Sequence, residues 1–127
     1  MDTPRRKILI VDDDAPILRG ISDKFTLEGF SVITAKDGTE GLEKALKEHP
    51  DLIVTDLLMP NANGLCFVEN LRKDDWGKNA HIIVWSNSHN SKTLDEAKRL
   101  GVNDFMVKSD WEYKDVVNKA REILDNQ

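Results

Sequence analysis

The sequence predicts an α/β fold, in which five parallel strands form one doubly wound sheet covered by helices on both faces. Short apolar runs rich in β-formers alternate along the chain with amphipathic stretches. Strict alternation of this kind implies right-handed crossovers and therefore a parallel sheet between two helical layers. The run Leu52-Ile53-Val54 is apolar at every position, as expected for a central strand that is buried on both sides.

The first strand and helix have clear boundaries. Lys7–Val11 (KILIV) is expected to be a fully buried strand. Asp14 suits the N-cap of the following helix, whose first turn tolerates Pro16, and Gly29 ends this helix after about Glu28. The predicted core-facing side of the helix carries Ile17, Ile21, Phe25 and Leu27.

The second unit and the third strand follow the same pattern. Phe30–Ala35 alternates like a strand, and Asp37-Gly38 opens a second helix that His49-Pro50 stops. Asp51–Thr55 is the third expected strand. The apolar side chains assigned to the second helix are Leu42, Ala45 and Leu46.

The second half of the chain supplies two further strands, His81–Trp85 (HIIVW) and Val102–Val107. Helices are expected from Asn63-Gly64, over about Ser91–Leu100, and from about Trp111 toward the end of the chain. Apolar side chains recur at helical spacing in the first and last of these helices, namely Leu65, Val68, Leu71, Val116, Val117, Ala120, Ile123 and Leu124.

Size and composition indicate a single domain over residues 1–127, with a core of about residues 6–125. The net charge of −5 argues against direct nucleic-acid binding, which requires cations to neutralise phosphates. The lone cysteine, Cys66, suits a reducing compartment. No apolar run approaches the roughly 20 residues of a membrane span. We therefore expect a cytoplasmic protein that does not bind a membrane.

Polar residues directly follow the carboxyl ends of the first, third, fourth and fifth predicted strands. Asp12-Asp13-Asp14 follows the first strand, Asp56 the third, Ser86-Asn87-Ser88 the fourth and Lys108 the fifth. In an open parallel sheet, sites form just outside the carboxyl ends of the strands. If these strands are neighbours, one pocket holds several carboxylates, a hydroxyl group and an ammonium group.

Such a pocket needs a cation, because two carboxylates about 4 Å apart repel by about 4 kcal/mol at an effective dielectric constant of ~20. Hard oxygen ligands suit Mg²⁺. Together with Mg²⁺, Lys108 and Ser86 fit a phosphoryl group, and a central carboxylate such as Asp56 can be the nucleophile that accepts it.

Each residue taken alone also has an ordinary structural explanation. Asp14 suits a helix cap, and Asp12 and Asp13 could be solvated loop acids. Lys108 could be a surface lysine and Phe105 an ordinary core residue. The functional interpretation depends on the polar candidates gathering at the carboxyl ends of the strands.

The sequence resembles the receiver domain of two-component response regulators, of the stand-alone single-domain type, over about residues 6–125. The resemblance is carried by ILIVDDD (8–14), DLIVTDLLMPNANG (51–64), HIIVWSNS (81–88) and GVNDFMVKS (101–109). It implies the flavodoxin-like strand order 2-1-3-4-5.

The resemblance also implies roles for individual residues. Asp56 would accept the phosphoryl group, which Ser86 and Lys108 would contact, while Ser86 and Phe105 would form the conformational switch. The implied Mg²⁺ site comprises Asp13, Asp56, the backbone carbonyl of Leu58 and, through water, Asp12.

The sequence departs from the family pattern at three positions. Ser109 stands where the family usually has Pro, Asn87 where it usually has Ala, and Phe105 where Tyr is more usual. Because a cis bond costs about 2.5–4 kcal/mol before a residue other than proline, we expect a trans Lys108–Ser109 bond.

The leading hypothesis is a phosphorylation switch that catalyses only its own phosphorylation and dephosphorylation and is not a turnover enzyme. A histidine kinase or phosphotransfer protein would be the donor. If the chain is complete, its signal would leave through residues 91–125, whose mixed charge suits a protein partner or a second copy. The alternatives are a haloacid-dehalogenase-type phosphatase, with Asp12 as nucleophile and Asp14 as acid/base, and a degenerate receiver that only binds partners.

Overall fold

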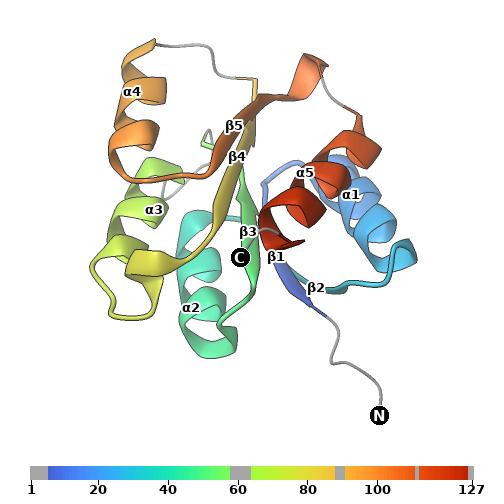
Figure 1. The fold of residues 1–127 in the computed structure, drawn as a ribbon, viewed down its shortest axis with the longest axis horizontal. Helices are drawn as coiled ribbons and strands as arrows, with labels where there is room; N and C mark the ends of the chain where they lie inside the picture. The colour runs from blue at the N-terminus through green and yellow to red at the C-terminus, as the bar shows by residue number, and fades with distance from the viewer. Residues whose placement is uncertain (1–5, 58–63, 88–90, 111, 126–127) are drawn as a thin grey trace.

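The computed structural model describes residues 6–57, 64–87, 91–110 and 112–125, and it confirms the predicted sheet. The strands are parallel neighbours in the order β2-β1-β3-β4-β5, with their carboxyl ends toward the top of Figure 1. They comprise β1 (Lys7–Val11), β2 (Ser31–Ala35), β3 (Leu52–Thr55), β4 (Ile82–Ser86) and β5 (Asp104–Val107).

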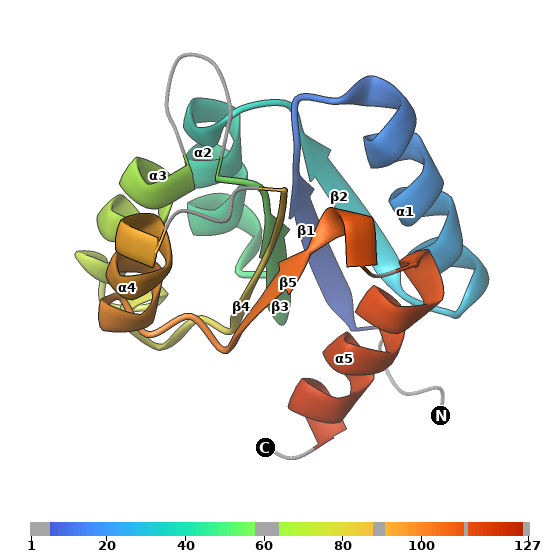
Figure 2. The ribbon, with the colours of Figure 1, turned by 90° about the horizontal axis from the view of Figure 1, so that it is seen from above.

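Helices cover both faces of the sheet, as Figure 2 shows. One face lies under α1 and α5, and the other lies under α2, α3 and α4. Each face has its own buried apolar cluster, so the core is two-layered, as a doubly wound sheet requires. The helices are α1 (Ala15–Leu27), α2 (Gly38–Glu48), α3 (Gly64–Arg72), α4 (Ser91–Arg99) and α5 (Tyr113–Asp125).

The expected helix boundaries rest on local chemistry that the structure confirms. Asp14 Oδ1 accepts a hydrogen bond from the N–H of Ile17, 3.2 Å away, and so caps α1. Asp37 caps α2 in the same way. Gly29, after α1, and Gly101, after α4, have φ angles of 97° and 78°, in the left-handed region that glycine adopts without strain.

Two side chains assigned to helix core faces are in fact exposed. Leu27 is 81% exposed and Leu46 is 38% exposed. Neither lies on the buried side of its helix. Leu27 lies two positions after the buried Phe25, about 200° further around the helix, and Leu46 directly follows the buried Ala45. The apolar stripe of α1 therefore ends at Phe25.

The fifth strand and the last helix also begin later than expected. The side-chain Oδ1 of Asn103 accepts the N–H of Ile82 at 2.8 Å, so a side chain occupies the place of a backbone partner and β5 begins at Asp104. The last helix begins at Tyr113. Its predicted start at Trp111, like Asn63 before α3, lies outside the described residues.

The described residues also include two short 3₁₀ helices, η1 (Gly77–Asn79) before β4 and η2 (Lys108–Asp110) after β5. Neither of them was predicted from the sequence. Among the described helices, none has the length and apolar character needed to cross a bilayer.

Candidate functional site

The carboxyl edge of the sheet brings two aspartates together on neighbouring strands. Val11 of β1 pairs in register with Thr55 of β3, so the next residues, Asp12 and Asp56, emerge side by side. The N–H of Asp56 donates to the carbonyl of Val11 at 3.0 Å, and the N–H of Asp12 donates to the carbonyl of Ala35 at 3.0 Å. The backbone ladder thus continues past the strands and fixes both acids.

Asp13 completes a cluster of acids at this edge. One carboxylate oxygen from each of Asp12, Asp13 and Asp56 lies within 4.8 Å of the others. Asp12 and Asp56 are buried, at 2% and 7% exposure, whereas Asp13 faces solvent. The cluster is therefore closed on the protein side and open to water at Asp13.

Lys108 inserts its ammonium group between the two buried acids. Its Nζ lies 2.7 Å from Asp12 Oδ2 and 2.8 Å from Asp56 Oδ2, and only 9% of its side chain is exposed. Lys108 is thus a bridging cation, and the interpretation of this residue as a surface lysine is wrong. The other oxygen of Asp56, Oδ1, accepts the N–H of Leu57 at 2.6 Å.

Burial and charge act against each other in this pocket. Burial alone would lower the pKa of Lys108, but its hydrogen bonds and charge attraction to Asp12 and Asp56 raise that pKa above 10.5. Burial raises the pKa of Asp12 above 3.8, although its hydrogen bond from Lys108 opposes this. The neighbouring acids therefore stabilise the charged form of Lys108, whereas burial works against the charged form of Asp12.

The acid cluster has the donor set that a small hard cation requires. Asp12, Asp13 and Asp56 offer carboxylate oxygens, which Mg²⁺ prefers, and the exposed side of the cluster leaves room for the waters that Mg²⁺ retains. Leu58, whose carbonyl is a predicted ligand, lies outside the described residues.

The remaining predicted site residues lie on the two neighbouring strands. Ser86 ends β4, is fully buried, and pairs in register with Val107, the residue before Lys108. Phe105 is half-buried and lines a groove with Leu94 of α4. Phe105 therefore belongs to the α4 side of the sheet and is not part of either buried core cluster.

Sequence reasoning missed two neighbours of the site, Trp85 and Tyr113, and did not foresee the hydrogen bond between Asn87 and Ser109. Lys108 Nζ lies over the ring of Trp85, 5.4 Å from its centroid, and Tyr113 packs edge-on against the same ring. Asn87 Oδ1 accepts a hydrogen bond from the N–H of Ser109. Trp85 precedes Ser86 at the end of an apolar strand, which is the only signal that could have drawn attention to it.

The fold and this site define a class of protein: a doubly wound sheet with an acid cluster and a bridging lysine at its carboxyl edge. Residues 8–120 match the family model described as the response regulator receiver domain. The chain belongs to this family. Receiver domains act as signalling switches rather than as turnover enzymes.

Individual relatives agree with this assignment. The chain is 32% identical over 120 residues to a probable transcriptional regulator, ycf27, of Porphyridium aerugineum, covering 94% of this chain and 48% of that protein. Overall, the chain spans about half the length of the first curated relatives it matches.

Solved structures give the same result. The chemotaxis protein CheY4 of Vibrio cholerae superposes with a TM-score of 0.88 at 29% identity, covering 95% of this chain and all of that one. A CheX–CheY complex with BeF₃ and Mg²⁺ from Borrelia burgdorferi contains a chain that superposes with a TM-score of 0.84 at 28% identity, covering 93% of this chain and 88% of that one.

Proposed function

We propose that the chain is a phosphoryl-accepting switch in which Asp56 takes up a phosphoryl group in a Mg²⁺-dependent reaction. The observation that carries this proposal is the position of Asp56, which lies within 4.8 Å of the oxygens of Asp12 and Asp13 and 2.8 Å from Lys108 Nζ. This carboxylate therefore lies between one cation, Lys108, and an acid cluster that could hold a second, and a dianionic phosphoryl group requires such partners.

The two oxygens of Asp56 have different surroundings, which suits a nucleophile. Oδ1 is held by the N–H of Leu57, whereas Oδ2 faces the ammonium of Lys108. In the transfer, a new bond joins an Asp56 oxygen to phosphorus as the bond from phosphorus to the donor atom breaks. The leaving group departs with the electron pair and takes a proton from solvent. Lys108 then pairs with the phosphoryl oxygens.

Asp12, Asp13 and Asp56 would hold the Mg²⁺, with the Leu58 carbonyl as a further proposed ligand. Bound Mg²⁺ supplies charge neutralisation for the transferring phosphoryl oxygens. A ligand set that includes the acceptor carboxylate itself keeps the metal beside the reacting atoms.

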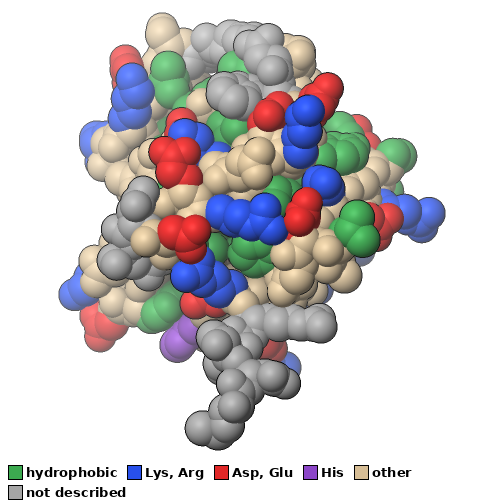
Figure 3. Space-filling model, turned by 45° about the vertical axis from the view of Figure 1, so that its right-hand side comes forward, with side chains coloured by type: hydrophobic (Ala, Val, Ile, Leu, Met, Phe, Trp, Pro, Cys, Tyr) green, Lys and Arg blue, Asp and Glu red, His purple; other side chains and the backbone are tan. Residues whose placement is uncertain are grey.

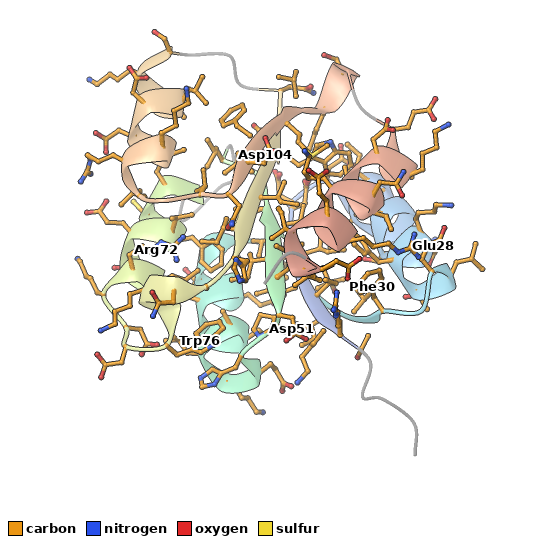
Figure 4. All side chains as sticks on the ribbon, viewed as in Figure 1. Glu28, Phe30, Asp51, Arg72, Trp76 and Asp104 are labelled. Carbon is orange, nitrogen blue, oxygen red and sulfur yellow. The ribbon has the colours of Figure 1, made fainter. Side chains whose placement is uncertain are left out.

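The proposal is tested by incubating the chain with a small phosphodonor, with Mg²⁺ or with a chelator, and following its intact mass. We expect one phosphoryl addition that requires Mg²⁺ and is lost in Asp56→Asn, which is nearly isosteric. Asp51→Asn is the matched control, because Asp51 lies near the opposite end of the same strand (Figure 4). Undiminished labelling of Asp56→Asn would refute the assignment.

We further propose that Ser86 and Phe105 relay phosphorylation to the surface formed by α4, β5 and α5. Ser86 is fully buried beside the residue before Lys108, and Phe105 lines the groove against α4. Amide hydrogen exchange, with and without a phosphoryl mimic and Mg²⁺, should change mainly in residues 86–120. Changes confined to α1 and α2 would mean that the output surface lies elsewhere.

This surface suits a protein partner or a second copy better than it suits nucleic acid. Acidic and basic side chains are interspersed on the neighbouring α1–α5 side of the molecule, which faces the viewer in Figure 3. On the surface formed by α4, β5 and α5, acids and bases are paired with each other, as in Lys119–Asp104 between α5 and β5 and Arg99–Glu96 within α4.

A histidine kinase or phosphotransfer protein is the proposed phosphodonor.

The phosphatase alternative assigns the nucleophile to Asp12 and the acid/base to Asp14. Asp12 and Asp56 are both buried, and each has one oxygen bonded by Lys108 and the other by a backbone N–H, so burial does not distinguish the two candidate nucleophiles. Asp14 itself is occupied in capping α1. The alternative predicts phosphate on Asp12 and continuous turnover of the donor, whereas the switch predicts a stoichiometric adduct on Asp56.

A further inference from the structure

Lys108 has an aromatic neighbour as well as two carboxylates. Its Nζ lies over the Trp85 ring, 5.4 Å from the centroid, within the range in which a cation is attracted to the ring face. Trp85 is 3% exposed, so this contact is shielded from water. The ammonium group of Lys108 therefore bonds to two carboxylates and also contacts the face of an aromatic ring.

The indole N–H of Trp85 argues that the ring itself matters at this position. Its Nε1 is buried and has no hydrogen-bond partner among the residues that the structure describes. Leaving a donor unsatisfied in the core is unfavourable, and a hydrocarbon side chain would fill the space without that cost. Core packing alone thus does not explain a tryptophan beneath Lys108.

Tyr113 supports the ring from α5. Its ring packs edge-on against Trp85, with centroids 5.8 Å apart and an interplanar angle of 75°. Gly20 of α1 leaves room for Tyr113, because a Cβ at Gly20 would lie 2.5 Å from the tyrosine ring. The stack therefore runs from α1 through Tyr113 and Trp85 to Lys108, on the sheet face opposite α4.

We propose that Trp85, supported by Tyr113, is a positioning residue that holds the Lys108 ammonium in place for the phosphoryl group. The inference rests on the proposed function, because Lys108 is assigned to the phosphoryl group there. Without the ring, the lysine side chain gains alternative rotamers, and fewer molecules present the ammonium where charge develops during transfer.

The first test compares phosphorylation rates of Trp85→Leu and Trp85→Phe with those of the unaltered chain, at several concentrations of a small phosphodonor. Trp85→Leu should lower the maximal rate by roughly 2- to 30-fold, the range that loss of a cation–π contact allows. The maximal rate of Trp85→Phe should lie between those of Trp85→Leu and the unaltered chain, because phenylalanine keeps a ring that attracts the ammonium more weakly. Phe25→Leu is the control, because Phe25 belongs to the same core cluster but packs against Phe30, near the other end of the sheet.

A double-mutant cycle separates positioning from general destabilisation. If Trp85 acts through Lys108, then Trp85→Leu should change the rate by less than about two-fold in a Lys108→Ala background. Should Lys108→Ala label too slowly to compare, the same cycle is measured on the binding of beryllofluoride with Mg²⁺. An equal loss in both backgrounds, or an unchanged rate for Trp85→Leu alone, overturns the inference.

Gly20→Ala probes the stack without altering Trp85 or Lys108. The added methyl group should displace the Tyr113 ring and lower the rate in the same direction as Trp85→Leu, and adding Tyr113→Ala should remove any further effect of the methyl group. Asp56→Asn is measured in parallel. If it labels, the proposed function fails; if it does not label and Trp85→Leu is unaffected, only the positioning role fails.

Discussion

The backbone N–H of Ser109 donates a hydrogen bond to the side-chain Oδ1 of Asn87, 3.0 Å away. These are two of the three positions at which the sequence departs from the usual receiver pattern. A proline at 109 has no N–H to donate, and an alanine at 87 has no acceptor to offer. Asn87 and Ser109 therefore form a hydrogen bond that the usual residues could not form. It joins the segment after β4 to the segment after β5, directly next to Ser86 and Lys108.

Asn87→Ala should loosen this tie, whereas Ser109→Ala should preserve it, because only the backbone of Ser109 takes part. We expect faster amide exchange at Ser109 in Asn87→Ala and a stability loss of about 0.5–1 kcal/mol, since both residues are exposed. Exchange measured by NMR and urea unfolding check this. Equal exchange rates in the two variants would contradict it.

Asp13→Ala should abolish Mg²⁺ binding and raise the stability of the metal-free protein. Removing one carboxylate relieves repulsion within the acid cluster, and Asp13 is the exposed member, so its loss leaves no cavity in the core. Titration calorimetry measures the metal affinity, and urea unfolding in a chelator measures the stability. A lower unfolding midpoint without Mg²⁺ would count against the repulsion argument.

Glu28 links α1 to α5 and should make stability depend on pH in the acid range (Figure 4). Hydrogen bonds from Arg121 and then Lys24 lower the pKa of Glu28 below 4.5. Because the pKa of this carboxyl group is lower in the folded chain than in the unfolded chain, its ionised form stabilises the fold at any pH above the unfolded-state pKa. This stabilisation is lost as the pH falls through the folded-state pKa.

Glu28→Gln should therefore lower the urea midpoint at pH 7, and the difference from the unaltered chain should shrink as the pH falls below 4.5. Glu43→Gln is the control, because Glu43 is an exposed helical acid. A difference that persists unchanged into the acid range would show that the charge of Glu28 is not its cause.

Arg72 lies at the end of α3 (Figure 4), and replacing it should lower the stability of the fold more than replacing any other charged residue outside the site. Its guanidinium donates to four backbone carbonyls, those of Leu100, Gly77, Ala80 and Gly101. Arg72→Met leaves these acceptors without their donor and should cost about 2 kcal/mol or more. Arg99→Met, at an exposed pair with Glu96, should change stability by less than about 1 kcal/mol. Similar losses in both variants would refute this role of Arg72.

Local patterns predicted most of the fold. Asp14, Asp37 and Gly29 mark helix ends through chemistry confined to a few neighbouring residues, so their roles were readable from the sequence. The strand order came from the resemblance, because alternation of strands and helices does not distinguish among doubly wound orders. Leu27 was misassigned because an apolar side chain at a helix end has no periodic partner beyond it.

Of the predicted site residues, Asp12, Asp13, Asp56 and Lys108 do meet, because parallel strands bring their carboxyl ends to one edge. Their roles in phosphoryl transfer stay predictions. The bond from Ser109 to Asn87 and the ring under Lys108 join residues more than twenty positions apart, at places set by tertiary packing. No periodic signal encodes such contacts.

The assignment of Asp56 as the phosphoryl acceptor is tested by identifying the residue that carries the phosphoryl group after reaction with a small phosphodonor and Mg²⁺. The acyl phosphate is reduced with borohydride, which converts the acceptor aspartate to homoserine, and the chain is then digested and sequenced by mass spectrometry. We expect modification at a single position, Asp56, and no modification when Mg²⁺ is chelated. Modification at Asp12, or equal modification without Mg²⁺, would contradict this assignment.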